Sequence, residues 1–170
     1  AKGGQEIISP RFTYHGYRFI EITGIDKPLP VGAVKGVVLS SIHELASRYE
    51  TSNTQVNQLW KNITWSSYGN FLSIPTDCPQ RNERLGWAGD ISVFSRTATY
   101  LADVPQFLRR YLRSMRDVQR TDGRFPDIAP LGGGFGGLLW GSAGITVPWE
   151  CYQQYGDTIL LSEHYDAMKR

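Results

Sequence analysis

The sequence predicts a mainly α-helical protein that begins with a short β segment. After about residue 50, hydrophobic residues recur at helical spacing, and the predicted helices are joined by short turns, which favours antiparallel helix pairs. Before that point, apolar and polar residues alternate with the period of a half-buried strand. The chain has 170 residues, 41% of them hydrophobic. That proportion is sufficient for a core and excludes a disordered segment.

The β segment consists of two predicted strands, over residues 14–23 and 34–40, with a turn at residues 24–28. The first alternates in polarity and the second is rich in β-branched side chains. An isolated two-stranded hairpin is only marginally stable in water. We therefore expect both strands to pair with residues outside this chain or to dock on the helical part, and we interpret the chain as a piece of a larger protein.

Five helices are predicted after the β segment. The first follows a cap at Ser52, with Gln three residues later as in a capping box. Asp90 is expected to cap the second helix, and Asp103 the third, which has Pro105 at an early position. The third helix places an apolar stripe over residues 107–118 and is expected to end near Gly123. The last two cover about 142–155 and the residues after Asp157.

Two long loops, at about 70–89 and 122–141, interrupt this pattern. They are rich in Pro, Gly, Trp and carboxylates, and loops of that length in a compact helical domain usually carry function. The glycines at 132–137 do not form a phosphate loop, because no strand precedes them and no Lys-Ser/Thr follows. Asp127 fits a cap and a pocket residue equally well.

Charge and composition exclude several classes of function. The net charge is +2 with no basic run, so nucleic acid is not an expected partner. No apolar stretch approaches the roughly 18–20 residues of a membrane span. His15, His43 and His164 are scattered, and Cys78 and Cys151 have no metal-ligand spacing. We expect no metal and no cofactor. A disulfide and free thiols both remain open, with two buried thiols favoured.

Residues 76–90 contain the densest group of reactive side chains. A purely structural interpretation is a solvated loop with ion pairs between Glu83 and Arg81 or Arg84. Against it, Pro79, Gly86 and Gly89 restrict the backbone, and Trp87 is costly to leave in water. Glycoside hydrolysis needs a carboxylic acid to protonate the leaving oxygen and a second carboxylate to direct a nucleophile. Asp and Arg bind sugar hydroxyls, and Trp offers a flat apolar face.

Residues 77–90, DCPQRNERLGWAGD, resemble the signature of the bacterial α-L-rhamnosidases of glycoside hydrolase family 78. The resemblance extends along nearly the whole chain, through FTYHGYRF at 12–19, DGRFPDIAP at 122–130, WGSAG at 140–144, VPW at 147–149 and YQQYGD at 152–157. It implies a partial (α/α)6 toroid of helical hairpins. Residues 1–45 would be the end of an adjacent β-sandwich domain with linker strands, and residues 46–170 the first part of the catalytic toroid.

The resemblance also implies an inverting enzyme that removes terminal α-L-rhamnose from glycosides or polysaccharides. Glu83 corresponds to the general acid, and the family's general base lies beyond Arg170. The substrate-binding residues would be Asp77, Arg81, Trp87, Asp90 and Trp140. The chain alone is therefore expected to be inactive. Another helical-toroid glycosidase, or a carbohydrate-binding or scaffold piece without activity, are the alternatives.

Two positions depart from the family pattern, Asn82 and Ser142, where relatives often have Asp. The loss of a charge at Asn82 is expected to lower the acid's pKa somewhat, and Ser142 to act as a neutral helix cap. Trp60, Trp65 and Trp149 lie in helical patterns and are expected in the core. We also expect the apolar faces of the helices at 52–67 and 104–119 to be uncovered, which would favour homo-oligomers or aggregation.

Overall fold

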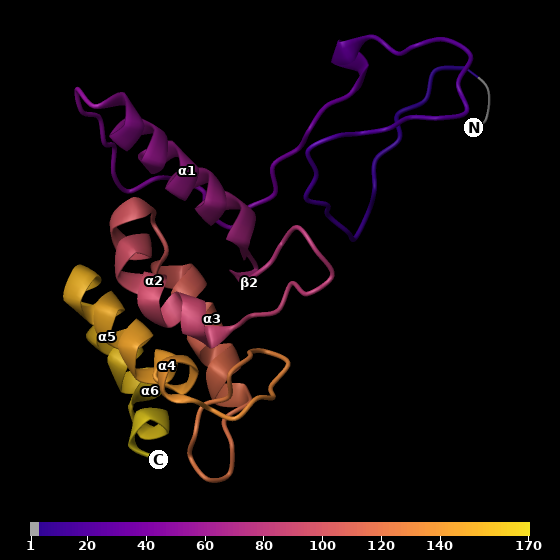
Figure 1. The fold of residues 1–170 in the computed structure, drawn as a ribbon. Helices are drawn as coiled ribbons and strands as arrows, with labels where there is room; N and C mark the ends of the chain where they lie inside the picture. Colours follow the sequence, from indigo (N-terminus) through magenta and orange to yellow (C-terminus); the bar gives the residue numbers. More distant parts are fainter. Residues whose placement is uncertain (1–3) are drawn as a thin grey trace.

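The computed structural model describes residues 4–170 and is mainly helical. Figure 1 shows a long N-terminal arm that extends away from a group of packed helices. The arm contains one 3-10 turn, η1, at Val31–Ala33. The elements that come after it are α1 (Thr54–Asn70), β1 (Phe71–Leu72), β2 (Ile74–Pro75), α2 (Ala88–Leu101), α3 (Pro105–Asp117), α4 (Leu138–Gly141), α5 (Ala143–Tyr155) and α6 (Thr158–Lys169).

Helix α5 lies at the centre of the packed helices. It contacts α2, α3, α4 and α6, and its Ala143, Val147 and Cys151 are fully buried. Small side chains at these positions let the neighbouring helices approach closely. Because α2 and α5 both begin at the end of the molecule where the two long loops lie, their packing sets the distance between those loops.

The apolar face of α3 is covered, so the expectation that it would be open is wrong. Leu108, Tyr111, Leu112 and Met115 are all fully buried, because α5 and α6 pack against them. On α1, by contrast, Leu59 and Trp65 are exposed. Trp65 and Trp149 are both more than half exposed. The prediction that these two lie in the core is therefore wrong for this chain: helical spacing shows that residues share a face, but not whether another helix covers it.

The helix termini agree with the sequence at some points and correct it at others. Gly156 ends α5 in the left-handed conformation, and the Asp157 side chain caps α6 through the Leu160 amide. On α1 the cap is Asn53, not Ser52. Helices α2 and α3 begin after Trp87 and Val104 without a side-chain cap. Asp90 and Asp103 therefore do not cap: Asp90 lies inside the first turn of α2, and Asp103 precedes the cap of α3 by one residue.

The third helix also ends earlier than predicted. It stops at Asp117, and Gly123 adopts its positive φ of 86° in the loop after it. Ser142 occupies the N-cap position of α5 without capping it, because its hydroxyl donates back to the Leu138 carbonyl. Cys78 and Cys151 are free thiols, with Cys78 half-buried and Cys151 buried. Burial raises the pKa of Cys151 to about 12.

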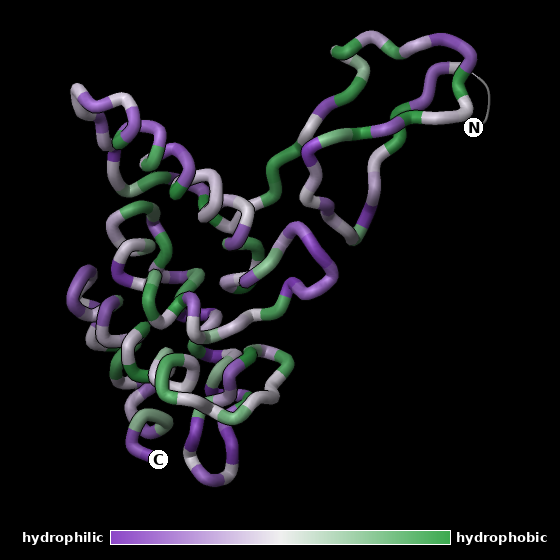
Figure 2. The backbone as a smooth tube through the Cα atoms, in the orientation of Figure 1, coloured by the Kyte–Doolittle hydropathy of each residue, from purple (hydrophilic) through white to green (hydrophobic). Residues whose placement is uncertain are grey.

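No regular strand forms within residues 4–40, which corrects the two strand predictions. Side chains from both predicted strands, including Ile20, Ile22 and Val34, line one small apolar hollow, but the backbones make no ladder. Figure 2 shows apolar residues distributed along this arm, and most of its large apolar side chains are exposed. Alternating polarity indicates a strand only where a neighbouring strand supplies the hydrogen bonds.

None of the helices in residues 4–170 combines the length and the apolar character needed to cross a membrane.

A buried histidine is expected to make the stability of this fold depend on pH. His164 on α6 is fully buried, stacks on Phe125 with ring centroids 5.4 Å apart, and has its Nδ1 3.0 Å from Arg116. Burial, together with the nearby Arg116 charge, lowers the pKa of His164 to about 4. In the unfolded chain it titrates near 6.5, so the unfolded state binds more protons between these values.

We therefore expect the free energy of unfolding to fall as the pH drops from about 6.5 to about 4, by up to about 3 kcal/mol. His164→Gln removes the titrating group but keeps an acceptor for Arg116, so it should flatten this dependence. Urea unfolding at several pH values measures it, with the exposed His43 as control in a His43→Gln variant. An unchanged slope in His164→Gln would assign the acid sensitivity to other groups.

Candidate functional site

A short hairpin delivers the first long loop to the site. Helix α1 ends at Asn70, and the antiparallel strands β1 and β2 come directly after it, with Phe71 opposite Pro75 and Leu72 opposite Ile74. The hairpin is anchored on the core, because Phe71 is buried and stacks on Phe107 at 4.7 Å between centroids. Asp77 therefore begins the loop from a fixed position.

Asp77 closes the base of this loop. Its backbone N–H donates to the Leu85 carbonyl at 3.1 Å, and its Oδ1 accepts from the Leu85 amide at 2.9 Å. Burial acts to raise the pKa of Asp77, but hydrogen bonds with Cys78, Glu83 and the Leu85 amide together leave it below the ordinary value. The lowered pKa favours the ionised form of Asp77.

Glu83 is held between two donors. Arg81 Nη2 lies 2.5 Å from Oε2, and Trp87 Nε1 donates to Oε1 at 3.0 Å. The ion pair expected between Glu83 and Arg81 is thus present, yet it does not make the loop a merely solvated one, since the glutamate side chain is only 29% exposed. The two bonds fix the carboxyl group while leaving it accessible.

A compact group of donor atoms results. One atom each from Asp77, Cys78 and Glu83 lies within 4.8 Å of the others, and among residues 4–170 these three alone could offer such a set to a metal ion. We assign no metal to it.

The two long loops are joined backbone to backbone. The Ala129 amide donates to the Gly86 carbonyl at 3.0 Å, and the Ala88 amide to the Asp127 carbonyl at 2.8 Å. The buried Tyr111 hydroxyl also donates to the Gly86 carbonyl, at 3.0 Å. A Cβ at Gly86 would lie 2.0 Å from the Ala129 carbonyl oxygen, so this close approach requires glycine.

Asp127 organises the second loop. Its Oδ2 accepts from the Phe135 amide at 2.8 Å, and its Oδ1 from the amides of Gly136 and Gly137, both at 3.0 Å. Asp127 is therefore a backbone anchor for the glycine-rich segment. Neither interpretation left open by the sequence describes it, because α4 has no side-chain cap and Asp127 does not line the cavity described below. The segment leads directly into α4, which carries Trp140.

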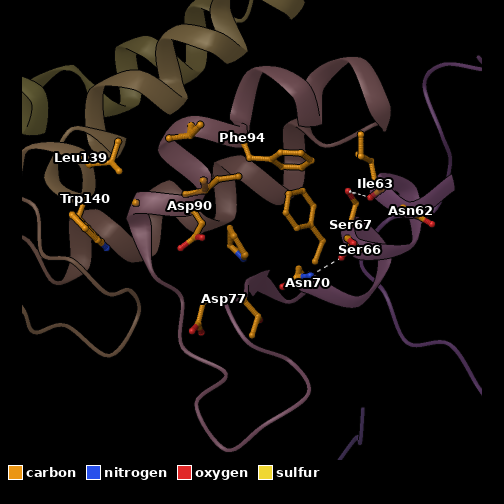
Figure 3. Close-up of a pocket in the computed structure, with 16 residues that line it drawn as sticks. Asn62, Ile63, Ser66, Ser67, Asn70, Asp77, Asp90, Phe94, Leu139 and Trp140 are labelled. Carbon is orange, nitrogen blue, oxygen red and sulfur yellow. Dashed lines mark hydrogen bonds between the residues drawn. The ribbon is translucent and has the colours of Figure 1, made fainter. Parts of the chain in front are cut away.

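Trp140 lies against the start of α2. A Cβ at Gly89 would meet the indole Nε1 at 2.8 Å, so glycine at this position gives the ring its place. Together with Asp77 and Asp90, Trp140 lines a cavity of about 650 Å³ between α1 and α2. Figure 3 shows the carboxyl groups of Asp77 and Asp90 on the same side of this cavity. Apolar side chains also line it, among them Ile63, Phe71, Ile91 and Phe94.

The structure thus brings the predicted site residues together in two overlapping groups. Asp77, Asp90 and Trp140 line the cavity, and Asp77, Arg81, Glu83 and Trp87 form the hydrogen-bonded loop beside it. Asp77 belongs to both. Asn82 is exposed, at the tip of the loop.

Sequence reasoning missed Tyr111, since it identifies this residue only as part of the apolar stripe of α3. The phenol is buried in an otherwise apolar stripe, and a buried hydroxyl needs a partner. The need for a hydrogen-bond partner could have singled out Tyr111 in the sequence, but it does not identify the Gly86 carbonyl as the acceptor. Burial, with the Asp90 charge as a smaller cause, raises the pKa of Tyr111 well above its ordinary value, so it remains a donor.

Comparison with known protein families agrees with this arrangement. The family model of the bacterial alpha-L-rhamnosidase 6 hairpin glycosidase domain matches residues 44–170. The chain belongs to the bacterial α-L-rhamnosidase family. A second model, of the bacterial alpha-L-rhamnosidase concanavalin-like domain, matches residues 1–40. The mainly helical fold is accordingly part of a toroid of helical hairpins.

Individual rhamnosidases are similar over almost the whole chain. An α-L-rhamnosidase of Streptomyces avermitilis is 46% identical over 162 residues, which cover 94% of this chain and 16% of that protein. One from Formosa agariphila is 41% identical over 174 residues, covering 100% of this chain and 19% of the relative. The chain thus spans less than a fifth of the length of these relatives.

Solved rhamnosidase structures share the fold. The crystal structure of the S. avermitilis enzyme complexed with L-rhamnose is 46% identical, with a TM-score of 0.73, and the match covers 76% of this chain and 13% of that one. Native α-L-rhamnosidase from Aspergillus terreus is 42% identical, with a TM-score of 0.79, covering 85% and 17%.

The place of Trp140 on Gly89 can be tested with two glycines. A Cβ at Gly69 on α1 would meet no atom within 4 Å, so Gly69→Ala should stabilise the protein by about 0.5–1 kcal/mol. Gly89→Ala should lack this gain and displace the Trp140 ring, which is 38% exposed, because the new methyl group would overlap it. Urea unfolding and tryptophan fluorescence measure the two effects. The same pair of measurements in a Trp140→Phe background separates the signal of Trp140 from that of the other tryptophans. An unchanged Trp140 signal in Gly89→Ala would show that the ring does not depend on Gly89.

Proposed function

We propose that this chain forms the part of an inverting α-L-rhamnosidase that supplies the general acid, Glu83, and most of the contacts to the sugar. The observation that carries the proposal is the position of Glu83. Its carboxyl group is fixed by Arg81 and Trp87 next to the charged Asp77, and this group adjoins a cavity lined by Asp90 and Trp140.

Glu83 is the carboxyl suited to protonate the leaving oxygen. A general acid must be held in a fixed position and must be reachable from the substrate side. Glu83 meets both conditions, because two bonds hold it and part of its side chain is exposed. Asp77 does not suit this role, since it holds its charge and is used to close the loop.

The remaining polar residues would bind and stabilise the sugar. As the glycosidic bond breaks, positive charge develops on the ring, in an oxocarbenium-like transition state. A carboxylate that stays ionised, such as Asp77, stabilises that charge. Asp90 at the cavity and Arg81 beside Glu83 offer an acceptor and donors to sugar hydroxyls, and Trp87 and Trp140 offer apolar faces to the ring and to its methyl group.

An inverting reaction needs one further carboxylate. It activates water on the face of the sugar opposite the acid, across roughly 6.5–9.5 Å. We propose that this base is a glutamate outside this chain, as the resemblance to the family implies. The Streptomyces avermitilis relative has been crystallised with L-rhamnose, which supports rhamnose as the sugar of this site too.

Glu83→Gln tests the role of the acid in the complete enzyme. Because a positioned general acid contributes roughly 10²–10⁴-fold, we expect kcat on unactivated rhamnosides to fall by about that factor. Aryl rhamnosides with good leaving groups need little protonation and should lose much less. Steady-state kinetics on both substrates measures the difference.

Glu44→Gln is the matched control, because Glu44 is exposed and lies outside the site, and its kinetics should be unchanged. Equal losses on both substrates in Glu83→Gln would remove the residue from the acid role. No loss on either would reject the proposed function of this loop.

The 170-residue chain by itself should not hydrolyse rhamnosides, since the proposed base lies outside it. Release of the aryl group from an activated rhamnoside, measured with purified monomeric chain, tests this. A Glu83→Gln version of the same preparation separates turnover by the chain from turnover by a contaminant. Activity that depends on Glu83 would contradict the prediction and make Asp77, Asp90 or Asp127 the base.

A further inference from the structure

One side chain of the N-terminal arm is less exposed than all the others in residues 4–39. Within residues 4–39, Tyr14 alone is not exposed. The guanidinium carbon of Arg84 lies 4.6 Å from the centroid of the Tyr14 ring, in a cation–π contact. Arg84 belongs to the loop that carries Glu83, the proposed acid. The one half-buried side chain within residues 4–39 is therefore in contact with that loop.

Arg84 links Tyr14 to the backbone beside Glu83. Its Nε donates to the Arg81 carbonyl at 3.1 Å, which closes a tight turn around the glutamate. Arg84 also has a φ of 51°, in the left-handed region that L residues with long side chains adopt only at a cost in energy. Such a conformation persists when the surroundings hold it, and the contacts of the Arg84 side chain with Tyr14 and Arg81 are part of those surroundings.

A second contact joins the arm to the same turn. A Cβ at Gly16 would lie 2.7 Å from the Cα of Gln80, so the two backbones meet directly. Tyr14 and Gly16 therefore touch the loop at both sides of Arg81. A segment that made only incidental contact would not need a glycine at the approach.

We propose that Tyr14 and Arg84 are positioning residues for the general acid: the N-terminal arm holds the turn at residues 80–84, and through it the Glu83 carboxyl group, in its working place. This inference rests on the proposed function of Glu83. Neither side chain touches the sugar in this scheme. Tyr14 acts through Arg84, and Arg84 acts through the Arg81 carbonyl.

The scheme gives a specific kinetic signature. Removal of the Tyr14 ring loosens the turn, so protonation of the leaving group should suffer while binding of the sugar by Asp90 and Trp140 should not. In the complete enzyme, we expect Tyr14→Ala to lower kcat on unactivated rhamnosides by about 2- to 5-fold, the equivalent of a partly exposed cation–π contact. KM and the rate on activated aryl rhamnosides should change little.

Two variants control for general damage to the arm. Tyr14→Phe keeps the aromatic face and should restore the wild-type rate. Tyr17→Ala removes an exposed tyrosine of the same arm and should leave kinetics unchanged. If Tyr14→Ala and Tyr17→Ala behave alike, Tyr14 has no positioning role.

Hydrogen exchange provides a readout that does not depend on activity. Amides in peptides covering residues 78–86 should exchange faster in Tyr14→Ala than in the wild type or in Tyr17→Ala. In the Tyr14→Ala and Arg84→Gln pair, the double variant should be no slower in kcat than Arg84→Gln alone, because both act through one contact. Additive losses would overturn the proposed linkage.

The kinetics of Glu83→Gln distinguish a failure of this inference from a failure of the proposed function on which it rests. If Glu83→Gln has no effect on unactivated substrates, the proposed function fails whatever Tyr14 does. If Glu83→Gln has the expected effect while Tyr14→Ala changes neither kcat nor exchange, only the positioning role fails.

Discussion

The site depends on the backbone pairing between its two long loops. The segment at 86–88 bonds to the segment at 127–129, and this is possible only because Gly86 has no side chain to meet the Ala129 carbonyl. Tyr111 adds a bond from the core to the same Gly86 carbonyl. Two loops that are about forty residues apart in the chain are thus placed by one contact, and every proposed functional residue lies on or next to one of them.

This pairing determines where the aromatic residues lie. On one side it leads into α2 directly after Trp87, which holds Glu83. On the other it sets Asp127, whose carboxylate gathers three amides of the glycine-rich segment and so directs the chain into α4. Trp140 then rests where Gly89 leaves room. The backbone contact at Gly86 and the ring contact at Gly89 thus fix the two tryptophans relative to Glu83.

The helices and the family of the chain could be predicted from the sequence, because both depend on local information. Helical spacing identifies the stretches that form α1, α2, α3, α5 and α6, and the residue types at 77–90 indicate carbohydrate chemistry. The predictions that fail depend on partners far along the chain. The alternation at 14–23 does not report whether a neighbouring strand is present, and the pattern of α3 does not report that α6 covers it.

Asp90 and Asp127 show the same limit within the site. Both are carboxylates in positions suited to a cap, and the sequence favours the cap for Asp90. The structure places Asp90 at the cavity and uses Asp127 to bind backbone amides. The role of such a carboxylate cannot be assigned from its neighbours in sequence, because its contacts form only when the chain folds.

The carboxyl groups of the site differ in their hydrogen-bond partners more than in their type. Asp77 accepts from a backbone amide at the closed base of the loop, and its pKa is lowered, so it serves as a fixed negative charge. Asp127 accepts from three backbone amides and serves as an anchor. Glu83, by contrast, is held by the side chains of Arg81 and Trp87. The two aspartates are tied to the backbone, whereas the position of Glu83, the proposed acid, depends on two side chains, one of them the largely exposed Arg81.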